Sequence, residues 1–300
     1  MHRALCLVSA EGALLGLADH GGEGGEEGVR CVPWRNLTHE KEQIKNIFCT
    51  IDQNSQNLLF RRDGDAATSV VMITVIIPTL NAGLRLPACL DALVPGAVDG
   101  LIKEVIVADG GSIDQTVEIA DGAGAKILNV AKGRGAQLAA GAKAARSDWL
   151  LFLHADTVLD STWTNEVHKF LENKKRAGVF TLSFDANGVC PNLVAWGAMI
   201  RTQLLKLPYG DQGLLISKTM YDDIGGYEPL QLFEDVDLIQ RLVKTKGTRA
   251  LHVFDAAATT SADRYERNGY VRQVIANFAR LIRYKFGARP EVIAEKYMTS

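Results

Sequence analysis

The chain has 300 residues, of which 47% are hydrophobic and 23% charged, so it can bury a large core in one or two domains. A formal net charge of -2 and a pI near 6.3 argue against bulk electrostatic binding of nucleic acid. Five scattered cysteines form no C-x-x-C pair, which favours the reducing cytoplasm over a disulfide scaffold or a zinc site. No run approaches the roughly 20 apolar residues that cross a bilayer, and the apolar opening lacks the features of a signal peptide.

The first 71 residues differ in character from the rest. They include a Gly- and Glu-rich stretch that cannot build a core, and residues 35–66 are mostly polar apart from a short helical pattern over 41–48. Met72 directly precedes a well-formed strand, a position that suits a natural start. We therefore expect residues 1–71 to be a weakly ordered or mis-annotated extension and residues 72–300 to form the folded domain.

From residue 73 onward, strand and helix patterns alternate. Short apolar runs predict strands over 73–77, 104–108, 125–130 and 150–153. Helical spacing and composition predict helices over 84–93, from 116 onward and over 135–145. Strands separated by helices of this length imply right-handed crossovers. The predicted fold is α/β, with a Rossmann-like, mostly parallel sheet that is covered by helices on both faces.

Polar residues follow the first two predicted strands, at the edge where open parallel sheets bind ligands. Pro78, Thr79 and Asn81 follow the first strand, and Asp109 with two glycines follows the second. A carboxylate at that turn can accept hydrogen bonds from a ribose diol or from a base. The alternative is a plain turn in which Asp109 caps the next helix.

The third and fourth strands end in cations and in metal ligands. Lys132 and Arg134 alternate with glycines at a helix start, a combination that predicts an anion site. A dinucleotide fingerprint is improbable, because the third glycine is missing and the loop follows the third strand. His154 and Asp156 follow the buried fourth strand and predict a divalent cation that holds a phosphorylated substrate. A turn with a helix cap is the alternative.

In their order along the chain, these motifs resemble the inverting glycosyltransferases of family two, which have the GT-A fold. The matching segments, over about 72–290, are Ile76-Ile-Pro-Thr-Leu-Asn81, Val105-Ile-Val-Ala-Asp109-Gly-Gly-Ser112, Lys132-Gly-Arg-Gly135, Leu153-His-Ala-Asp156, Gly225-Gly-Tyr-Glu228 and Phe233-Glu-Asp235. Gly210-Asp-Gln-Gly213 and Thr260-Ser-Ala262 are similar to segments of small bacterial family-two-like transferases. The resemblance implies a nucleotide-binding half over about 72–157 and an acceptor half over about 158–300.

The resemblance also implies roles for residues at matching positions. It places a nucleotide-sugar donor, a UDP- or GDP-sugar, against Pro78, Thr79, Asn81, Asp109, Lys132, Arg134, His154 and Asp156. His154 and Asp156 take the place of the D-x-D motif, whose last Asp binds Mg²⁺ or Mn²⁺ at the diphosphate. Asp235, beside Glu234, matches the catalytic base that deprotonates the acceptor hydroxyl during inverting attack on the anomeric carbon. A solvated helix start is the alternative for Glu234 and Asp235.

Three departures from the family pattern alter these expectations. His154 replaces an Asp, which predicts a weaker metal affinity or an altered metal preference. Ala82 and Gly83 stand where many members carry an acidic residue after Asn81. The sequence lacks the Q-x-x-R-W motif of processive synthases, and Arg264 lies roughly in its place, within reach of the diphosphate. We therefore predict the transfer of a single sugar by a hexosyltransferase-like enzyme.

The acceptor half carries fewer signals. Asp211 and Gln212 lie between the metal motif and the base, and Gly226 belongs to a matching glycine pair. Together with Arg264 they are candidates for contact with the acceptor, although a plain turn explains the glycines beside Asp211 equally well. Trp196 fits core packing better than stacking on a sugar or lipid.

The segment 269–286 predicts a basic amphipathic helix. Arg272, Arg280 and Arg283 lie off an apolar face that is formed by Val271, Val274, Ile275, Phe278, Leu281 and Ile282. Docking onto the sheet is the commoner use of such a face, and we expect it here. Peripheral contact with an anionic membrane is the alternative. In that case the acceptor is a lipid and the cytoplasmic protein works at the inner face of the membrane.

Two other functions remain open from the sequence. A sugar-phosphate nucleotidyltransferase also carries a glycine-rich basic loop on a Rossmann-like sheet, but usually directly after the first strand. A non-catalytic, membrane-associated binding module on a degenerate GT-A fold would explain His154 and the Ala82-Gly83 pair. Asp109, Asp156 and Asp235, which fit a working site, count against that module.

Overall fold

The computed structural model describes residues 4–8, 14–18, 71–172, 175–290 and 292–293. The first two of these ranges form an antiparallel two-stranded sheet, β1 (Ala4–Val8) with β2 (Leu14–Ala18). The short helix expected over 41–48 lies outside the described residues, as does most of the expected extension. Most of the described residues therefore belong to the domain that was expected over 72–300.

Eight strands form one mixed sheet in the order β5-β4-β3-β6-β9-β8-β10-β7. They are β3 (Ile73–Thr79), β4 (Ile102–Asp109), β5 (Lys126–Asn129), β6 (Trp149–Phe152), β7 (Val158–Leu159), β8 (Ala177–Phe184), β9 (Leu214–Ser217) and β10 (Leu251–Thr260). Four of the seven pairings are parallel, and β7 and β9 run against the other six strands. The predicted Rossmann-like, mostly parallel sheet is confirmed.

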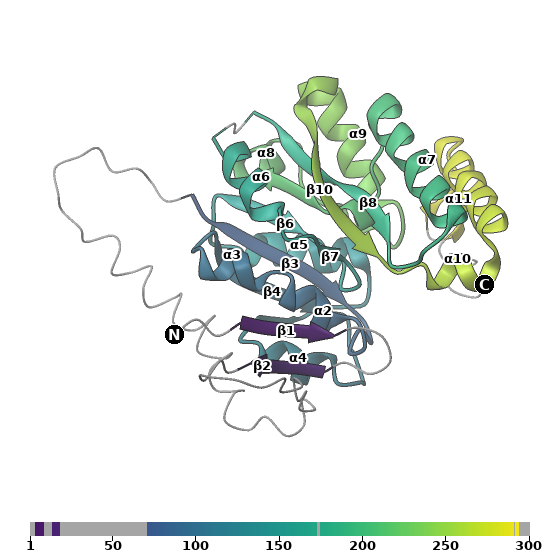
Figure 1. Ribbon diagram of the computed structural model, residues 1–300. Coiled ribbons are helices and arrows are strands. Elements are labelled where there is room, and N and C mark those ends of the chain that lie inside the picture. The colour runs from purple at the N-terminus through teal and green to yellow at the C-terminus, as the bar shows by residue number, and fades with distance from the viewer. Residues whose placement is uncertain (1–3, 9–13, 19–70, 173–174, 291, 294–300) are drawn as a thin grey trace.

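Helices cover both faces of this sheet (Figure 1). One face packs around the fully buried Trp163 and carries α2 (Leu86–Asp91), α3 (Val94–Val98), α4 (Thr116–Gly122) and α6 (Trp163–Phe170). The other face forms a second core with α5 (Arg134–Ala144), α8 (Lys218–Asp223) and α9 (Glu234–Lys246). Every residue of β6 is buried, which explains why its sequence is a continuous apolar run and not an alternating one.

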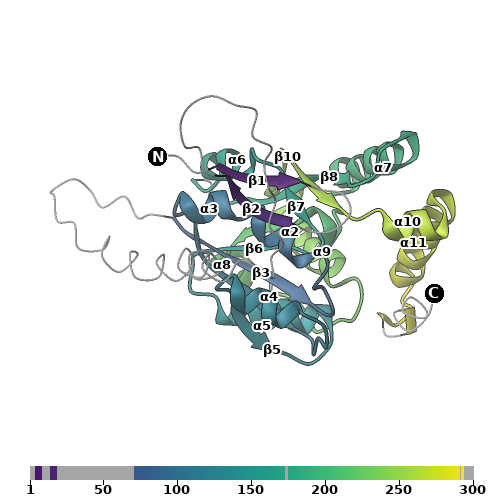
Figure 2. The ribbon, with the colours of Figure 1, turned by 60° about the horizontal axis from the view of Figure 1, so that its bottom comes forward.

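Three helices lie beyond the two covering layers (Figures 1 and 2). They are α7 (Val189–Leu205), which follows β8, and α10 (Asp263–Asn268) with α11 (Tyr270–Lys285), which follow β10. In both views α7 and α11 stand on the same side of the molecule, and their residues are in contact. Among the described helices, none combines the length and the apolar character that a membrane span requires.

The first strand and the helix after it differ from their predicted extents. β3 continues to Thr79 instead of ending at Pro78. The neighbouring β6 pairs with β3 only as far as Ile76. The backbone nitrogen of Pro78 therefore faces no strand, and its missing N–H costs no hydrogen bond of the sheet. The helix predicted over 84–93 is observed as α2, which is two residues shorter at each end.

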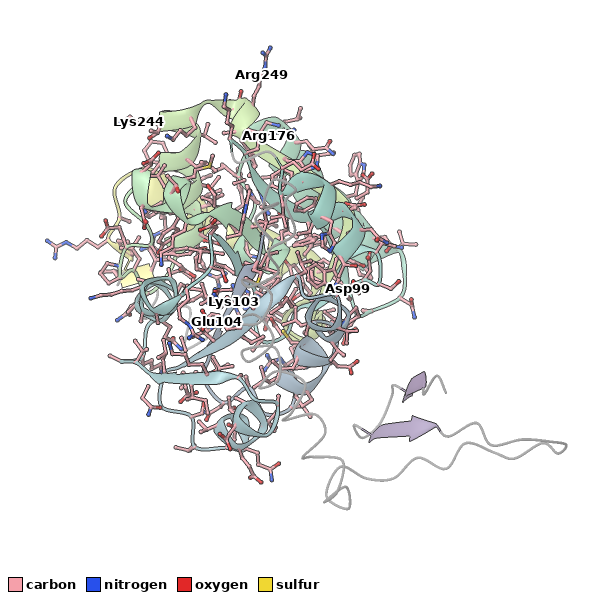
Figure 3. All side chains as sticks on the ribbon, turned by 90° about the vertical axis from the view of Figure 1, so that its left-hand side faces the viewer. Asp99, Lys103, Glu104, Arg176, Lys244 and Arg249 are labelled. Atoms are coloured by element: carbon pink, nitrogen blue, oxygen red, sulfur yellow. The ribbon has the colours of Figure 1, made fainter. Side chains whose placement is uncertain are left out.

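Charged groups at the amino ends of the parallel strands serve the structure (Figure 3). At the start of β4, the buried Glu104 accepts a hydrogen bond from Oγ1 of Thr74 at 3.0 Å and pairs with Arg146 at 3.3 Å. Figure 3 also shows Arg176, which directly precedes β8, and Arg249, which lies two residues before β10. Ligand sites of open α/β sheets form at the opposite, carboxyl ends.

Two glycines inside helices should respond oppositely to alanine. A Cβ on Gly141 of α5 would lie 2.4 Å from Cγ2 of the fully buried Ile76, whereas no described atom lies within 4 Å of a Cβ on Gly197 of α7. Gly197→Ala should raise the free energy of unfolding by about 0.5–1 kcal/mol through helix propensity. Gly141→Ala should lower it by about 1–3 kcal/mol through overpacking. Denaturant unfolding measures both, and shifts of the same sign would contradict this account.

Candidate active site

An open cleft with a volume of about 350 Å³ lies near the carboxyl ends of β6, β8 and β10. Its walls come from the segment after β6, the starts of α5 and α9, the loop before β9, and α10 with α11. This volume falls within the roughly 300–1000 Å³ of typical small-molecule pockets. The cleft is therefore the candidate active site.

Both residues of the predicted metal pair, His154 and Asp156, line this cleft. Burial lowers the pKa of His154 well below its ordinary value, and the positive charge of Arg134 lowers it further. The imidazole is therefore neutral near pH 7, the form in which histidine binds metal ions. In the part of the chain that the structure describes, no three His, Cys, Asp or Glu side chains gather into a metal site. The protein thus offers this pair and not a complete coordination shell.

Asp235, the predicted base, lies in the first turn of α9 and also lines the cleft. Its Oδ2 accepts a hydrogen bond from the backbone N–H of Gly210, and its Oδ1 accepts one from the N–H of Val236 at 2.7 Å. A carboxylate in the first turn is favoured by the partial positive charge of the helix N-terminus. The carboxylate is therefore held in one orientation at the cleft.

Gly210 lets the loop before β9 approach both functional groups. A Cβ at this position would lie 2.6 Å from Nε2 of His154 and 3.2 Å from Oδ2 of Asp235. Any side chain would therefore push the imidazole and the carboxylate apart. From the sequence, this glycine indicated only a turn.

Glu234, predicted to act with Asp235, is 1% exposed. Its Oε1 lies 3.4 Å from Nη1 of Arg134, and its Oε2 has no hydrogen-bond partner among the described residues. Burial raises the pKa of Glu234 to about 7, Arg134 opposes this shift, and Asp235 adds to it. Because it is enclosed, Glu234 anchors Arg134 at the cleft wall, and Asp235 is the more accessible of the two carboxylates.

The four candidate acceptor contacts divide into two groups. Asp211 and Arg264 line the cleft. Gln212 is fully buried, and its amide bonds a carbonyl of β8 at 3.0 Å and a hydroxyl of α7 at 2.8 Å. Gly226 is also buried, and its carbonyl accepts from Arg241 at 2.6 Å. The polar groups of Gln212 and Gly226 are thus bonded within the fold and do not line the cleft.

Asp211 is surrounded by charged groups of the cleft. Burial raises its pKa to about 6; Arg201 opposes this shift, while Asp235 and Asp156 add to it. Its Oδ1 is buried and has no hydrogen-bond partner among the described residues. Because buried polar atoms are nearly always bonded, this oxygen marks a place for a ligand group or a cation.

The predicted nucleotide wall forms two interlocked turns outside the cleft lining. Asp109 is 2% exposed and accepts from Oγ1 of Thr79 (2.9 Å), Oγ of Ser112 (2.5 Å) and the N–H groups of Gly111 (2.9 Å) and Ser112 (2.8 Å). Burial alone would raise the pKa of Asp109, but these bonds lower it below its ordinary value. Asn81 also accepts a backbone N–H of the second turn at 2.9 Å. A carboxylate has about four acceptor positions, so a base or ribose can use Asp109 only by replacing one of these bonds.

The predicted anion site at the start of α5 is only partly present. Arg134 lines the cleft, and Lys132 is exposed. The N–H of Gly135, however, donates to the carbonyl of Leu230 at 3.1 Å. A Cβ on Gly135 would lie 2.2 Å from the carbonyl oxygen of Glu228. Gly135 therefore allows a neighbouring segment to pack on the helix N-terminus, and Arg134 is the cation that faces the cleft.

Two residues that position the site were not predicted. The buried Gln137 donates from Nε2 to carbonyl oxygens at the ends of β3 and β4, both at 2.7 Å, and so ties α5 to these strands. Arg85, at the cleft, pairs with Asp263 at 2.6 Å and with Asp185 at 3.1 Å. Their partners lie 29 to 178 positions away along the chain, so no local pattern marks either residue.

The sheet and the polar cleft at its carboxyl ends define the GT-A class. A model of the family described as Glycosyl transferase family 2 matches residues 74–227. The chain therefore belongs to glycosyl transferase family 2, and the prediction from the ordered motifs is confirmed. The matched range contains His154 and Asp156 and ends before Asp235. It gives no support to the nucleotidyltransferase alternative.

Two relatives from Mycobacterium tuberculosis are similar to part of the chain. A PGL/p-HBAD biosynthesis glycosyltransferase (strain ATCC 25177 / H37Ra) is 37% identical over 101 residues, which cover 29% of this chain and 36% of that protein. Glucosyl-3-phosphoglycerate synthase (strain ATCC 25618 / H37Rv) is 31% identical over 103 residues, which cover 31% and 32%. The similarity thus spans about a third of the length of these relatives.

Two solved structures share the fold. Glucosyl-3-phosphoglycerate synthase from Mycobacterium tuberculosis, in complex with Mn²⁺, uridine diphosphate and glucosyl-3-phosphoglycerate, has a TM-score of 0.50 at 20% identity and covers 73% of this chain and 85% of that chain. S. aureus TarS 1-349 has a TM-score of 0.50 at 18% identity and covers 65% and 63%. At these identities the similarity concerns the fold.

The stability of the protein should depend on pH through Glu234. Its raised pKa means that the folded protein binds this proton more tightly than the unfolded chain does. The corresponding stability is complete below pH 4.5 and is lost as the pH rises through about 7. From about pH 5 to pH 8, the wild-type protein should therefore lose up to about 3 kcal/mol of unfolding free energy relative to Glu234→Gln. Denaturant unfolding across this range tests the expectation, which parallel pH profiles would contradict.

Proposed function

We propose that this chain is an inverting glycosyltransferase that transfers one sugar from a nucleoside-diphosphate sugar to an acceptor hydroxyl. The observation that carries the proposal is the placement of His154 and Asp156 in one cleft with Asp235. Gly210 packs against the imidazole of His154 and the carboxylate of Asp235. The reaction needs positive charge to neutralise the leaving diphosphate and a base to accept the hydroxyl proton. Membership of glycosyl transferase family 2 supports the same reaction class.

Asp235 is the general base in this proposal. Its carboxylate accepts the proton of the acceptor hydroxyl while the oxygen forms its bond to the anomeric carbon. The bond from that carbon to the diphosphate oxygen breaks, and its electron pair leaves with the nucleoside diphosphate. Attack from the face opposite the leaving group inverts the configuration. The N–H groups of Gly210 and Val236 orient the carboxylate before the acceptor arrives.

Arg134 and Arg264 provide fixed positive charge for the diphosphate. Both line the cleft, and a guanidinium matches the geometry of phosphate oxygens. Glu234 holds Arg134 in place. The pKa of Arg264 is lowered by burial and by repulsion from Arg134, Arg280 and Arg267. An anionic ligand between these groups relieves that repulsion.

His154 and Asp156 fit a divalent cation, Mg²⁺ or Mn²⁺. A neutral imidazole and a carboxylate are both metal ligands, and diphosphate oxygens and water would complete the coordination of a bound cation. A cation bound here would neutralise the diphosphate as it leaves. The related synthase structure holds Mn²⁺ with uridine diphosphate, which supports a UDP-sugar as the first donor to test and a GDP-sugar as the second.

The acceptor side of the cleft carries a chain of polar groups. Nε2 of Gln273 donates to Oδ1 of Asn277 at 3.0 Å, and Nδ2 of Asn277 donates to the hydroxyl of Tyr265 at 3.3 Å. All three residues line the cleft from α10 and α11. Amide and hydroxyl groups of this kind are suited to an acceptor with several hydroxyls. With no Q-x-x-R-W motif in the sequence, the proposal is one transfer per acceptor and not polymer synthesis.

Asp235→Asn should reduce kcat by about 10²–10⁴-fold, because the amide cannot accept the hydroxyl proton. The measurement is the release of UDP or GDP from nucleotide sugars in the presence of a panel of hydroxyl acceptors. Asp237→Asn is the matched control: Asp237 lies two residues further along α9, pairs with Arg241 at 2.6 Å and does not line the cleft. Equal rates in both variants would contradict the role of Asp235. Donor binding without turnover in the wild-type protein would favour the binding module instead.

Donor binding should stabilise the protein and should need the metal pair. Ligand at 100 times its dissociation constant adds about 2.7 kcal/mol, which for a domain of this size raises the midpoint of thermal unfolding by roughly 5–10 °C. We expect this rise with UDP or GDP in the presence of Mn²⁺, and we expect Asp156→Ala to abolish the metal-dependent part. A full rise in the absence of metal would contradict the assignment of His154 and Asp156.

A further inference from the structure

The helix α11 presents an apolar stripe to solvent. Five of its side chains, spaced by three or four residues, are 39–74% exposed: Val271, Val274, Ile275, Phe278 and Ile282. This is the face that we expected to dock on the sheet, and the structure corrects that expectation. The inward face of α11 is mixed: Gln273 is buried and Asn277 and Arg280 line the cleft, while Leu281, the sixth residue of the predicted apolar face, is buried against Phe233 and Val236.

The neighbouring helix α7 carries a second stripe on its exposed side. Val189, Leu193, Trp196 and Leu204 are 63–83% exposed and recur at helical spacing. Trp196, expected to pack in the core, therefore lies at the surface. The two stripes are carried by helices that are in contact and stand on the same side of the molecule (Figures 1 and 2). We call these nine side chains, five on α11 and four on α7, the apolar surface.

The charged side chains on α7 and α11 have a single sign. Neither α7 nor α11 contains an Asp or a Glu. Arg272 and Arg283 are exposed and lie eleven residues apart, about three helical turns, so they share one flank of the α11 stripe. Lys285 is exposed near the end of the same helix. The apolar surface is therefore bordered by cations and by no acidic residue of either helix.

We propose that the apolar surface docks on an anionic lipid bilayer, with Arg272, Arg283 and Lys285 against the lipid phosphates. Exposed apolar stripes with cations at their borders are typical of helices that lie in the plane of a membrane interface. Interspersed aromatic side chains, here Trp196 and Phe278, suit that boundary. A second copy of the chain is a poorer occupant, because two such surfaces face to face would bring like charges together.

Docking through the apolar surface places the cleft close to the lipid headgroups. α11 lies between them, with its apolar stripe outward and its Gln273 and Asn277 side chains toward the cleft. The diameter of one helix, about 10 Å, separates the two faces. If the proposed function holds, on which this step rests, an acceptor hydroxyl carried by a membrane lipid can reach Asp235.

Trp196 makes the docking measurable in the full-length protein. It is 63% exposed, whereas Trp149 and Trp163 are fully buried, and Trp34→Phe removes the remaining tryptophan. Vesicles of mixed phosphatidylcholine and phosphatidylglycerol should shift its emission to shorter wavelengths, and brominated acyl chains should quench it. Vesicles of phosphatidylcholine alone should bind roughly 10- to 100-fold more weakly, because each cation near an anionic surface contributes about fivefold. No shift and no co-sedimentation with either vesicle would overturn the proposal.

A matched pair of substitutions tests the location of the contact. Val271 on α11 and Val98 at the end of α3 are 74% and 70% exposed, and in Figure 1 the two helices lie on opposite sides of the molecule. Val271→Glu should weaken vesicle binding by roughly tenfold or more, and Val271→Glu with Phe278→Glu should abolish it, whereas Val98→Glu should bind as the wild type does. Equal binding by Val271→Glu and Val98→Glu would overturn the proposal. So would a dimer, seen by analytical ultracentrifugation, that only Val271→Glu dissociates.

The docking and the proposed chemistry fail separately. Asp235→Asn and Asp156→Ala should bind vesicles like the wild type, because neither residue belongs to the apolar surface. Val271→Glu should keep the nucleotide-induced rise in the unfolding midpoint. Vesicle binding without a nucleotide response would support the docking and contradict the proposed transferase function. A nucleotide response without vesicle binding would contradict only the docking.

Discussion

The contact between Gly210 and the pair formed by Asp235 and His154 is the constraint on which the site depends. It joins three parts of the chain: the segment after β6, the loop before β9 and the first turn of α9. The backbone N–H of Gly210 binds the carboxylate, and the missing side chain leaves room for the imidazole. One residue of the proposed metal pair, His154, and the proposed base, Asp235, are therefore placed by one close backbone approach. Such an approach has no tolerance for a Cβ.

Several carboxylates lie around that contact and repel one another. The carboxylates of Asp156, Asp211 and Asp235 lie near one another, which together with burial holds the pKa of Asp211 above its ordinary value. Burial and the charge of Asp235 likewise raise the pKa of Glu234, to about 7. Arg134 offsets only part of this negative charge. Stability is given up to keep these acids together, and the cation of the proposed function would offset part of their charge.

The two faces of the outer helix α11 have different surroundings. α11 directs amide and guanidinium groups into the cleft and leaves five apolar side chains exposed, while Leu281 packs inward. The helix therefore belongs to the site through one face and to the surroundings of the protein through the other. With α7 beside it, the exposed apolar area is too extended to be read as scattered surface residues. The proposed recognition of the acceptor and the proposed docking on a membrane would both involve this one helix.

The sequence by itself determined the α/β fold, the positions of β3, β4, β5 and β6, and the residues at their ends, because hydrophobic periodicity and strand-end polarity are local properties. It also placed Asp156 and Asp235 in their motifs. Only the tertiary structure decided that a bond from Thr79 saturates Asp109, that Gln212 is buried and that Gln137 and Arg85 position the site. These outcomes depend on partners far apart in the chain. Likewise, periodicity showed that α11 has two faces, but which one meets the protein is decided by the polar cleft that the rest of the fold presents to it.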